Sequence, residues 1–150
     1  MIILGINAYH ADSSAAIFSD GKLIVAAEEE RFRRIKHWAG FPSLAIEFCL
    51  NEMGVKLSEV DRICIGRDTK AKIFKKGLFM LKGLGKNNSL FFDRIDNSRK
   101  IDNIESELAT IGSISAKELK SKITYVEHHR SHLASAFFAS PFEESTILSI

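Results

Sequence analysis

The fold is decided in the stretch Ala15-Ala16-Ile17-Phe18-Ser19-Asp20-Gly21-Lys22-Leu23-Ile24-Val25-Ala26-Ala27. Two apolar runs, residues 15–18 and 23–27, flank the dipeptide Asp20-Gly21. An Asp-Gly pair between apolar runs is a strong hairpin signal, because glycine accepts the positive φ that a tight turn between strands requires. The sequence therefore predicts two antiparallel strands joined at this turn.

A further strand precedes the hairpin. Residues 2–8 form a short and mostly apolar run, which indicates a buried first strand. The polar segment 9–14 separates this run from the hairpin. We therefore expect the chain to open with a three-stranded antiparallel meander that has a polar loop after its first strand.

Helices and strands alternate after the meander. The pattern predicts a helix over residues 43–53, a strand over 60–65 and another strand over 122–126. A helix over residues 128–139 and a final strand over 146–150 complete the series. This order predicts an α/β fold of the ribonuclease-H-like type, which is also the first half of the actin-like ATPase fold: a three-stranded antiparallel meander followed by αβ units.

Composition and length suit one ordinary globular domain. Hydrophobic residues make up 45% of the 150 residues and charged residues 27%, values that exclude a disordered chain. A net charge of +2 gives no argument for nucleic acid, and the N-terminus resembles neither a signal peptide nor a membrane span. Cys49 and Cys64 are expected to be buried free thiols, which suits a reducing cytoplasm. The final strand ends without a turn or cap, so we expect residues 1–150 to be the N-terminal part of a longer polypeptide.

A helical insertion is expected over residues 69–120. Its first part, residues 69–92, contains six lysines and no acidic residue, with bulky apolar side chains between them. This composition would suit an anionic membrane, a nucleic acid or an acidic partner. No clean amphipathic helix and no RNA-binding motif is present, so a flap that packs on a neighbouring domain is the favoured interpretation.

Three histidines lie close together near the end of the chain. His128 and His132 are four residues apart, so on a helix they leave the same face and could share one metal ion. His129 leaves the helix on a different face. Histidines on helices are more often surface residues or hydrogen-bonded core residues, and the spacing alone leaves both interpretations open.

Two polar segments are further candidates. In the loop after the first strand, an adjacent imidazole and carboxylate, His10 and Asp12, could hold and deprotonate a hydroxyl, or the segment could simply form a turn. The charged run 28–37 would ordinarily face water. Its alternative role is an anion-binding lip. That lip would consist of Arg33, Arg34, Lys36 and His37.

Four blocks of sequence together resemble the carbamoyltransferase family, which includes nodulation and antibiotic-tailoring O-carbamoyltransferases. The chain is similar to the N-terminal part of their domain related to threonylcarbamoyl-adenosine transferases. The blocks are Leu4-Gly5-Ile6-Asn7 with the loop after it, Ser14-Ala15-Ala16 through Asp20-Gly21, Ala27-Glu28-Glu29-Glu30-Arg31-Phe32 through His37 with Phe41-Pro42, and Val126-Glu127-His128-His129-Arg130-Ser131-His132.

The resemblance implies a two-module enzyme. A C-terminal module would make carbamoyl-adenylate from carbamoyl phosphate and ATP, and the N-terminal module would pass the carbamoyl group to a hydroxyl of a small molecule. A divalent metal, iron in the family, would be held by His128, His132 and an aspartate beyond residue 150. Lys36 matches a basic residue that contacts the anionic donor, and Arg34 and Ser14 are its neighbours in that role. No membrane and no nucleic acid is expected as a partner.

One departure concerns the catalytic loop. The family commonly has His-Asp-x-Ser, whereas here Ala11 precedes Asp12 and His10 lies one residue earlier. Asp12 and Ser14 therefore match directly, and His10 serves as the catalytic base only if the loop shifts. Alternative functions are threonylcarbamoyl transfer to tRNA and a non-catalytic, partner-binding domain of the same fold. The glutamate-rich stretch into Lys36-His37-Trp38 fits the small-molecule branch better.

Overall fold

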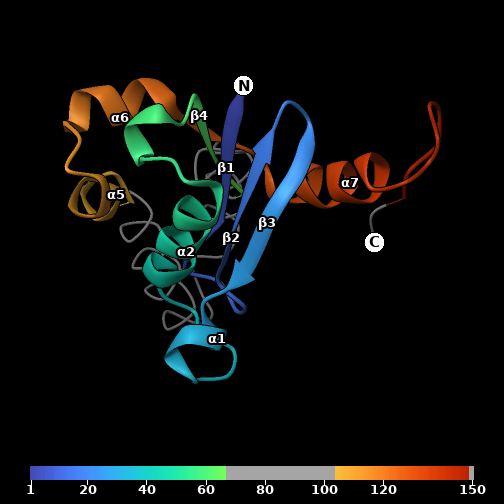
Figure 1. Ribbon diagram of the computed structural model, residues 1–150. Helices are drawn as coiled ribbons and strands as arrows, with labels where there is room; N and C mark the ends of the chain where they lie inside the picture. Colours follow the sequence, from blue (N-terminus) through green and yellow to red (C-terminus); the bar gives the residue numbers. More distant parts are fainter. Residues whose placement is uncertain (67–103, 149–150) are drawn as a thin grey trace, which may run out of the picture.

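The computed structural model describes residues 1–66 and 104–148 (Figure 1). The described chain forms one five-stranded sheet, with helices against one face and a last helix beyond β5. The elements are β1 (Ile2–Asn7), β2 (Ser14–Ser19), β3 (Lys22–Glu28), α1 (Glu30–Arg33), α2 (Ser43–Met53), the 3-10 helix η1 (Leu57–Glu59), β4 (Arg62–Ile65), α5 (Ile104–Gly112), α6 (Ala116–Lys122), β5 (Ile123–Tyr125) and α7 (His128–Phe138).

The strand order is β3-β2-β1-β4-β5. β1, β2 and β3 pair antiparallel in sequence order, whereas β4 lies parallel to β1 and β5 parallel to β4. This is the sheet of a ribonuclease-H-like or actin-like half-domain, so the predicted fold class is confirmed. Because β1, β4 and β5 run in the same direction, the loops that follow them leave the sheet at the same edge.

The hairpin forms where the sequence predicts it. Ser19 pairs with Lys22, and the two residues between them both have positive φ, 49° for Asp20 and 80° for Gly21. That backbone matches the twist of the two strands and suits Asp-Gly. The register shifts between Ile17 and Phe18, which leaves Ile24 of β3 as an unpaired, bulged residue opposite them.

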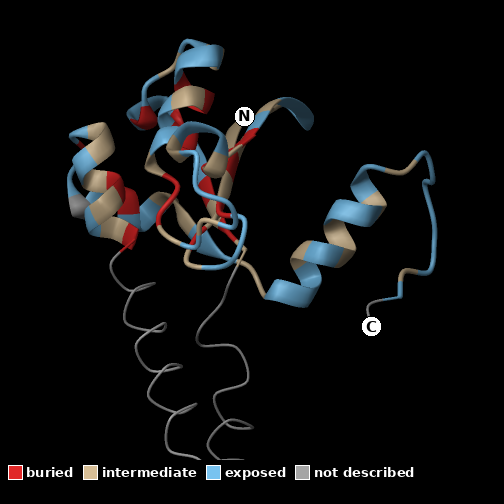
Figure 2. Ribbon diagram, turned by 90° about the horizontal axis from the view of Figure 1, so that it is seen from below, coloured by how far each residue is buried: buried red, intermediate tan, exposed pale blue. Residues whose placement is uncertain are grey.

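One face of the sheet carries the hydrophobic core, as Figure 2 shows by its buried residues between the sheet and the helices. Alternate strand residues are almost fully buried there, and α2 covers them with the stripe Ala45, Ile46, Cys49 and Leu50. Burying each large aliphatic side chain contributes about 1.5–3 kcal/mol. The strand residues of this core are Leu4, Ile6, Ala15, Ile17, Ala27, Ile63 and Ile65. α2 ends as predicted, at Gly54 in the left-handed conformation.

The prediction of a final strand over residues 146–150 is wrong for residues 146–148, the part that the structure describes. Residues 146–148 have no strand pairing, and the side chain of Leu148 is 80% exposed. A strand forms only where a neighbour pairs with its backbone groups, and no described strand lies beside this segment. α7 has no buried residue either, and it projects away from the core in Figure 2.

Two other expectations meet the structure in part. Residues 69–103 of the predicted helical insertion lie outside the described residues, whereas α5 and α6 make its last part helical. Cys49 is a fully buried free thiol, and Cys64 is a half-buried one. Within residues 1–66 and 104–148, no helix is long and apolar enough to span a bilayer.

Candidate active site

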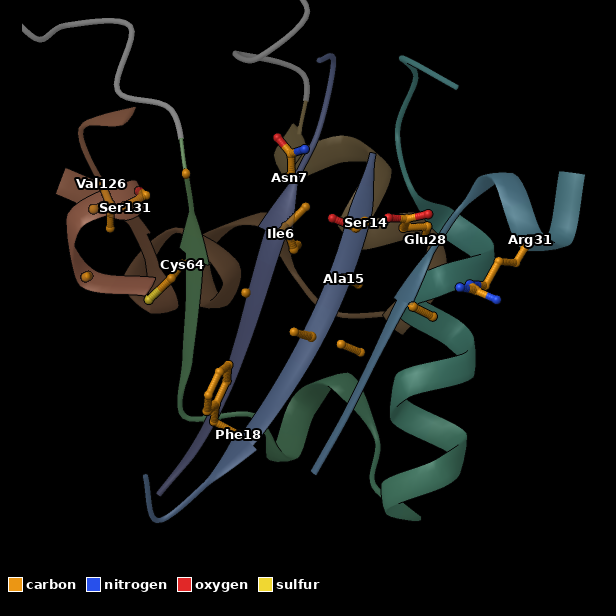
Figure 3. Close-up of a pocket in the computed structure, with 16 residues that line it drawn as sticks. Ile6, Asn7, Ser14, Ala15, Phe18, Glu28, Arg31, Cys64, Val126 and Ser131 are labelled. Atoms are coloured by element: carbon orange, nitrogen blue, oxygen red, sulfur yellow. The ribbon is translucent and has the colours of Figure 1, made fainter. Parts of the chain in front are cut away.

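A hollow of about 660 Å³ lies against the face of the sheet opposite the core (Figure 3). Side chains alternate between the two faces of a strand, so the residues between the core positions point this way. They are small along its floor, where Gly5, Ala16 and Cys64 lie. Figure 3 shows Asn7, Ser14 and Glu28 at one end of the hollow and Phe18 at the other. Ser14, a predicted donor-binding residue, therefore lines this hollow.

The helix that borders the hollow begins at a defined point. The Val126 amide donates to the carbonyl of Ile65 at 2.8 Å, which continues the pairing of β5 with β4 by one residue. The Glu127 carboxylate accepts a hydrogen bond from the Arg130 amide at 3.1 Å and caps α7. The first helical residue is consequently His128, at the sheet edge where the parallel strands end.

The two predicted metal ligands face each other. The Nε2 atoms of His128 and His132 lie 3.1 Å apart, and their rings are nearly perpendicular, with an interplanar angle of 85°. Two nitrogens bound to one ion at metal–nitrogen distances of 2.0–2.1 Å and roughly 90–110° apart are separated by about 2.8–3.4 Å. The pair therefore fits two ligands of one ion, and equally a hydrogen bond between a protonated and an unprotonated nitrogen. Among residues 1–66 and 104–148, no carboxylate or thiol joins them as a third ligand.

The loop after β1 brings another imidazole to this pair. The ring of His10 lies 5.6 Å from that of His128, centroid to centroid. The ring of His129 also lies 5.9 Å from that of His128, centroid to centroid. Two candidate groups that are far apart in the sequence thus meet, because the loops after β1 and β5 leave the sheet at one edge.

Asp12 pairs with a different histidine. Its Oδ1 lies 2.8 Å from Nδ1 of His37, and the His37 amide donates to Oε2 of Glu30 at 3.0 Å. The hydrogen bond to the Asp12 carboxylate, with a smaller effect of its charge, raises the pKa of His37 above its ordinary value. Asp12, Glu30 and His37 each offer a ligand atom within 4.8 Å of the others, a spacing that would also admit an ion. Because Asp12 Oδ1 and His37 Nδ1 already lie within hydrogen-bond distance of each other, we assign a hydrogen bond, and not a bound ion, to this contact.

Backbone hydrogen bonds hold the two loops of that contact together. The Tyr9 amide donates to Gly40 O at 3.1 Å, and the Ser13 amide donates to Trp38 O at 3.0 Å. The buried Ser13 hydroxyl contacts Gly40 O at 2.7 Å and His10 O at 3.0 Å. The position of Asp12 relative to His37 is therefore a property of two interlocked loops.

The charged run does not simply face water. Glu29 is fully buried; its carboxylate accepts hydrogen bonds from Nε of Arg33 at 2.7 Å and from the amides of Leu44 and Ala45 at 3.3 and 2.8 Å. It thereby satisfies amides in the first turn of α2 and lies at the positive end of that helix. The expectation of a solvated run is wrong for Glu29, because the first turn of α2 supplies the donors that a buried carboxylate needs.

The residues of the predicted anion-binding lip also differ in their surroundings. Arg33 is occupied: besides Glu29 it donates to Ser43 Oγ at 2.9 Å, and its guanidinium lies 4.5 Å from the Trp38 ring centroid. Arg34 and Lys36 are exposed and lie outside the lining of the hollow. Arg31 lines the hollow instead, although sequence reasoning passed over it.

Sequence reasoning also missed the stack of Arg33 on Trp38 and the close approach of Gly40 to the same indole ring. A Cβ at Gly40 would lie 2.7–2.8 Å from atoms of the indole ring, so only glycine allows this approach. The four-residue spacing of Glu29 and Arg33 is the one signal in the sequence that points to their pairing. No spacing rule links either of them to Trp38.

Several known proteins are similar to this chain in sequence. A family profile described as "Carbamoyltransferase N-terminus" matches residues 2–150. An uncharacterized protein of Synechocystis sp. is 38% identical over 97% of this chain and 24% of its own length. Nodulation protein NolNO of Sinorhizobium fredii is 34% identical over 96% of this chain and 20% of its own length. This chain thus spans a quarter or less of these two relatives.

A solved structure is also similar. YeaZ from Pseudomonas aeruginosa aligns with a TM-score of 0.46 and 16% sequence identity, over 92% of this chain and 48% of that one. The sequence match from residue 2 to residue 150 includes the histidine pair, the loop after β1 and the charged run. The chain belongs to the carbamoyltransferase N-terminal family.

Proposed function

We propose that this chain is the transfer part of an O-carbamoyltransferase. In the complete protein, a C-terminal module makes carbamoyl-adenylate from carbamoyl phosphate and ATP. The present domain then passes the carbamoyl group to a hydroxyl of a small molecule. The observation that carries this proposal is the juxtaposition of the His128–His132 pair with the Asp12 loop at one edge of the sheet, beside an open hollow.

A divalent metal, with iron as our candidate, belongs to the proposal. His128 and His132 would hold it through their Nε2 atoms, whose separation of 3.1 Å suits a shared ion, and a further ligand would come from beyond the described residues. When bound, such an ion supplies Lewis-acid stabilisation of negative charge on phosphate oxygens. Both rings are exposed, so no protein group has to move away before an ion can enter.

The cationic residues serve the anionic donor in this proposal. Arg34 and Lys36 carry exposed positive charges on the loop that holds His37. Arg31 and Ser14 line the hollow itself. Hydrogen bonds from charged donors to phosphate are shorter and stronger than neutral ones, so the three cationic residues would attract the adenylate phosphate. Of the four residues, Arg31 and Ser14 would contact it at the polar end of the hollow.

The loop after β1 serves the acceptor. His10 and Asp12 are the sequence-based candidates for contact with the attacking hydroxyl, and both have exposed side chains. The acceptor would therefore approach from the solvent side of the sheet edge. The two thiols are free, and we propose a reducing cytoplasm as the compartment of the reaction.

The activity is tested on the full-length protein with ATP and carbamoyl phosphate. We expect pyrophosphate release that requires carbamoyl phosphate, followed by AMP release. Threonylcarbamoyl transfer would instead show as activity that requires a threonine-derived donor and tRNA. Absence of both activities would favour a non-catalytic domain.

Metal content tests the histidine assignment separately. We compare the full-length protein with His128→Ala, His132→Ala and the matched control His129→Ala, by elemental analysis after purification. We expect the first two variants to lose most of the bound metal and the control to keep it. Equal metal content in all four proteins would overturn the assignment.

A further inference from the structure

We propose that His37, oriented by Asp12, is the group that accepts the proton of the attacking hydroxyl, and that His10 belongs with the His128–His132 pair. This inference rests on the proposed function and names the proton acceptor within it. In the sequence, the histidine nearest to Asp12 is His10. In the structure, the Asp12 carboxylate contacts His37 instead.

The two histidines have different surroundings. The His10 ring packs 5.6 Å from that of His128, and its Nδ1 lies 3.2 Å from the carbonyl oxygen of the neighbouring Ala11. Within the described chain, no hydrogen bond joins the side chains of His10 and Asp12. His37 has the carboxylate that His10 lacks, at 2.8 Å. A carboxylate beside an imidazole is the arrangement that orients a histidine base and stabilises its protonated form.

Two hydrogen bonds fix the orientation of His37. The backbone amide is held by Oε2 of Glu30 at 3.0 Å, and ring Nδ1 by Oδ1 of Asp12 at 2.8 Å. A carboxylate accepts but does not donate, so the neutral ring carries its hydrogen on Nδ1. The lone pair is then on Nε2. The side chain is 76% exposed, so a small hydroxyl can reach the ring from solvent.

The pair lies beside the hollow. The side-chain amide of Asn7, which lines the hollow, donates to the backbone carbonyl of Asp12 at 3.1 Å. Glu30, which holds the His37 backbone, is the chain neighbour of Arg31, another lining residue. Asp12 and Glu30 are thus the carboxylates against His37, and Lys36 is the adjacent positive charge in the chain.

The step balances without a further reactant. The acceptor oxygen attacks the carbamoyl carbon of carbamoyl-adenylate, and a new carbon–oxygen bond forms. The bond from that carbon to the phosphate oxygen breaks, and AMP leaves with the electron pair. The hydroxyl proton passes to Nε2 of His37, which returns it to solvent after AMP has left. No oxidant or reductant takes part.

The decisive variant is His37→Gly in the full-length protein. His37 has a φ of 54°, which glycine adopts without steric cost, and the removed ring leaves space for an added imidazole. His37→Asn is the second variant, because asparagine also tolerates this φ and keeps a polar side chain that cannot serve as a base.

Asp12→Asn removes the orienting charge, and its matched control is Asp20→Asn. Asp20 is also exposed with positive φ, and it pairs with the N-terminal amine at the opposite end of the strands.

The measurements separate the two half-reactions. Pyrophosphate release from ATP and carbamoyl phosphate reports formation of the adenylate. AMP release, with glycerol as the hydroxyl probe and water as the background acceptor, reports the transfer. We expect His37→Gly and His37→Asn to lower AMP release about 10²-fold or more while pyrophosphate release stays within about twofold, and millimolar imidazole to restore part of the rate in His37→Gly only.

The dependence of the transfer rate on pH distinguishes a proton-accepting His37 from one that only supports the structure. The acidic limb of the transfer rate should lie at lower pH in Asp12→Asn than in the wild type, because the carboxylate that favours protonated His37 is gone, and should stay in place in Asp20→Asn. Undiminished AMP release in His37→Gly would overturn the inference while the proposed function stands. A decrease without imidazole rescue and with an unmoved limb would also overturn it. Absence of pyrophosphate release in the wild type would instead refute the proposed function.

Discussion

Substitution of Glu29 by glutamine tests how the charged run is built into the fold. Glu29 is fully buried, and its carboxylate accepts hydrogen bonds from Arg33 Nε, from the Leu44 amide and from the Ala45 amide. Glutamine has nearly the same shape, but it lacks the charge and presents a donor where the carboxylate presents an acceptor. The substitution therefore changes the chemistry of the site and leaves its packing almost intact.

The magnitude follows from these contacts. A hydrogen bond to a charged group contributes about 1.5–3 kcal/mol, and a neutral one about 0.5–1.5 kcal/mol. A negative charge at a helix N-terminus contributes roughly 0.3–1 kcal/mol more. Arg33 keeps some access to water, which reduces its part in the loss. We therefore expect Glu29→Gln to lower the free energy of unfolding by about 2–3 kcal/mol.

Urea denaturation measures the change directly. Trp38 is the single tryptophan of the 150 residues, and it lies against the Arg33 guanidinium, so its fluorescence reports on this cluster. With a urea m-value of about 2 kcal/mol/M, the midpoint should fall by about 1–1.5 M. Glu47→Gln, an exposed position on the same helix, is the control and should change stability by less than about 0.5 kcal/mol. Equal midpoints for Glu29→Gln and Glu47→Gln would refute the account of the buried carboxylate.

Two more predictions concern the loop that carries His37. Gly40→Ala places a Cβ 2.7–2.8 Å from the Trp38 ring, so we expect a loss of about 1–3 kcal/mol by thermal denaturation, whereas Gly5→Ala, with 3.8 Å to its nearest neighbour, should change stability much less. NMR titration should give His37 a pKa above its ordinary value of about 6.5, and Asp12→Asn should lower it. Because the folded-state pKa is raised, the stabilisation from this contact is fully present below the unfolded-state pKa and is lost as pH rises through the folded-state pKa. An unshifted His37 pKa in the wild type would contradict the Asp12 contact.

Local patterns in the sequence predicted most of the fold. The Asp20-Gly21 turn, the apolar stripe of α2 and Gly54 at its end each follow from rules that act over a few residues. The spacing of His128 and His132 likewise predicts their facing geometry, because a helix places residues four apart on one face. The strand expected over residues 146–150 depended on a neighbour for its pairing, and no short pattern could supply that information.

What the sequence determined by itself is most of the described elements, their order, and the histidine pair on one helix. Each of these depends on residues close together along the chain, and the order of the elements leaves few topologies to consider. Only the tertiary structure decided which distant groups meet. It buried Glu29 under the first turn of α2, placed His10 beside His128, and gave Asp12 to His37. The physical reason is that parallel strands end at one edge of the sheet, so the loops after β1 and β5 converge there. The backbone hydrogen bonds between residues 9–13 and 38–40, and not the spacing of Asp12 from any histidine, then select the partner of Asp12.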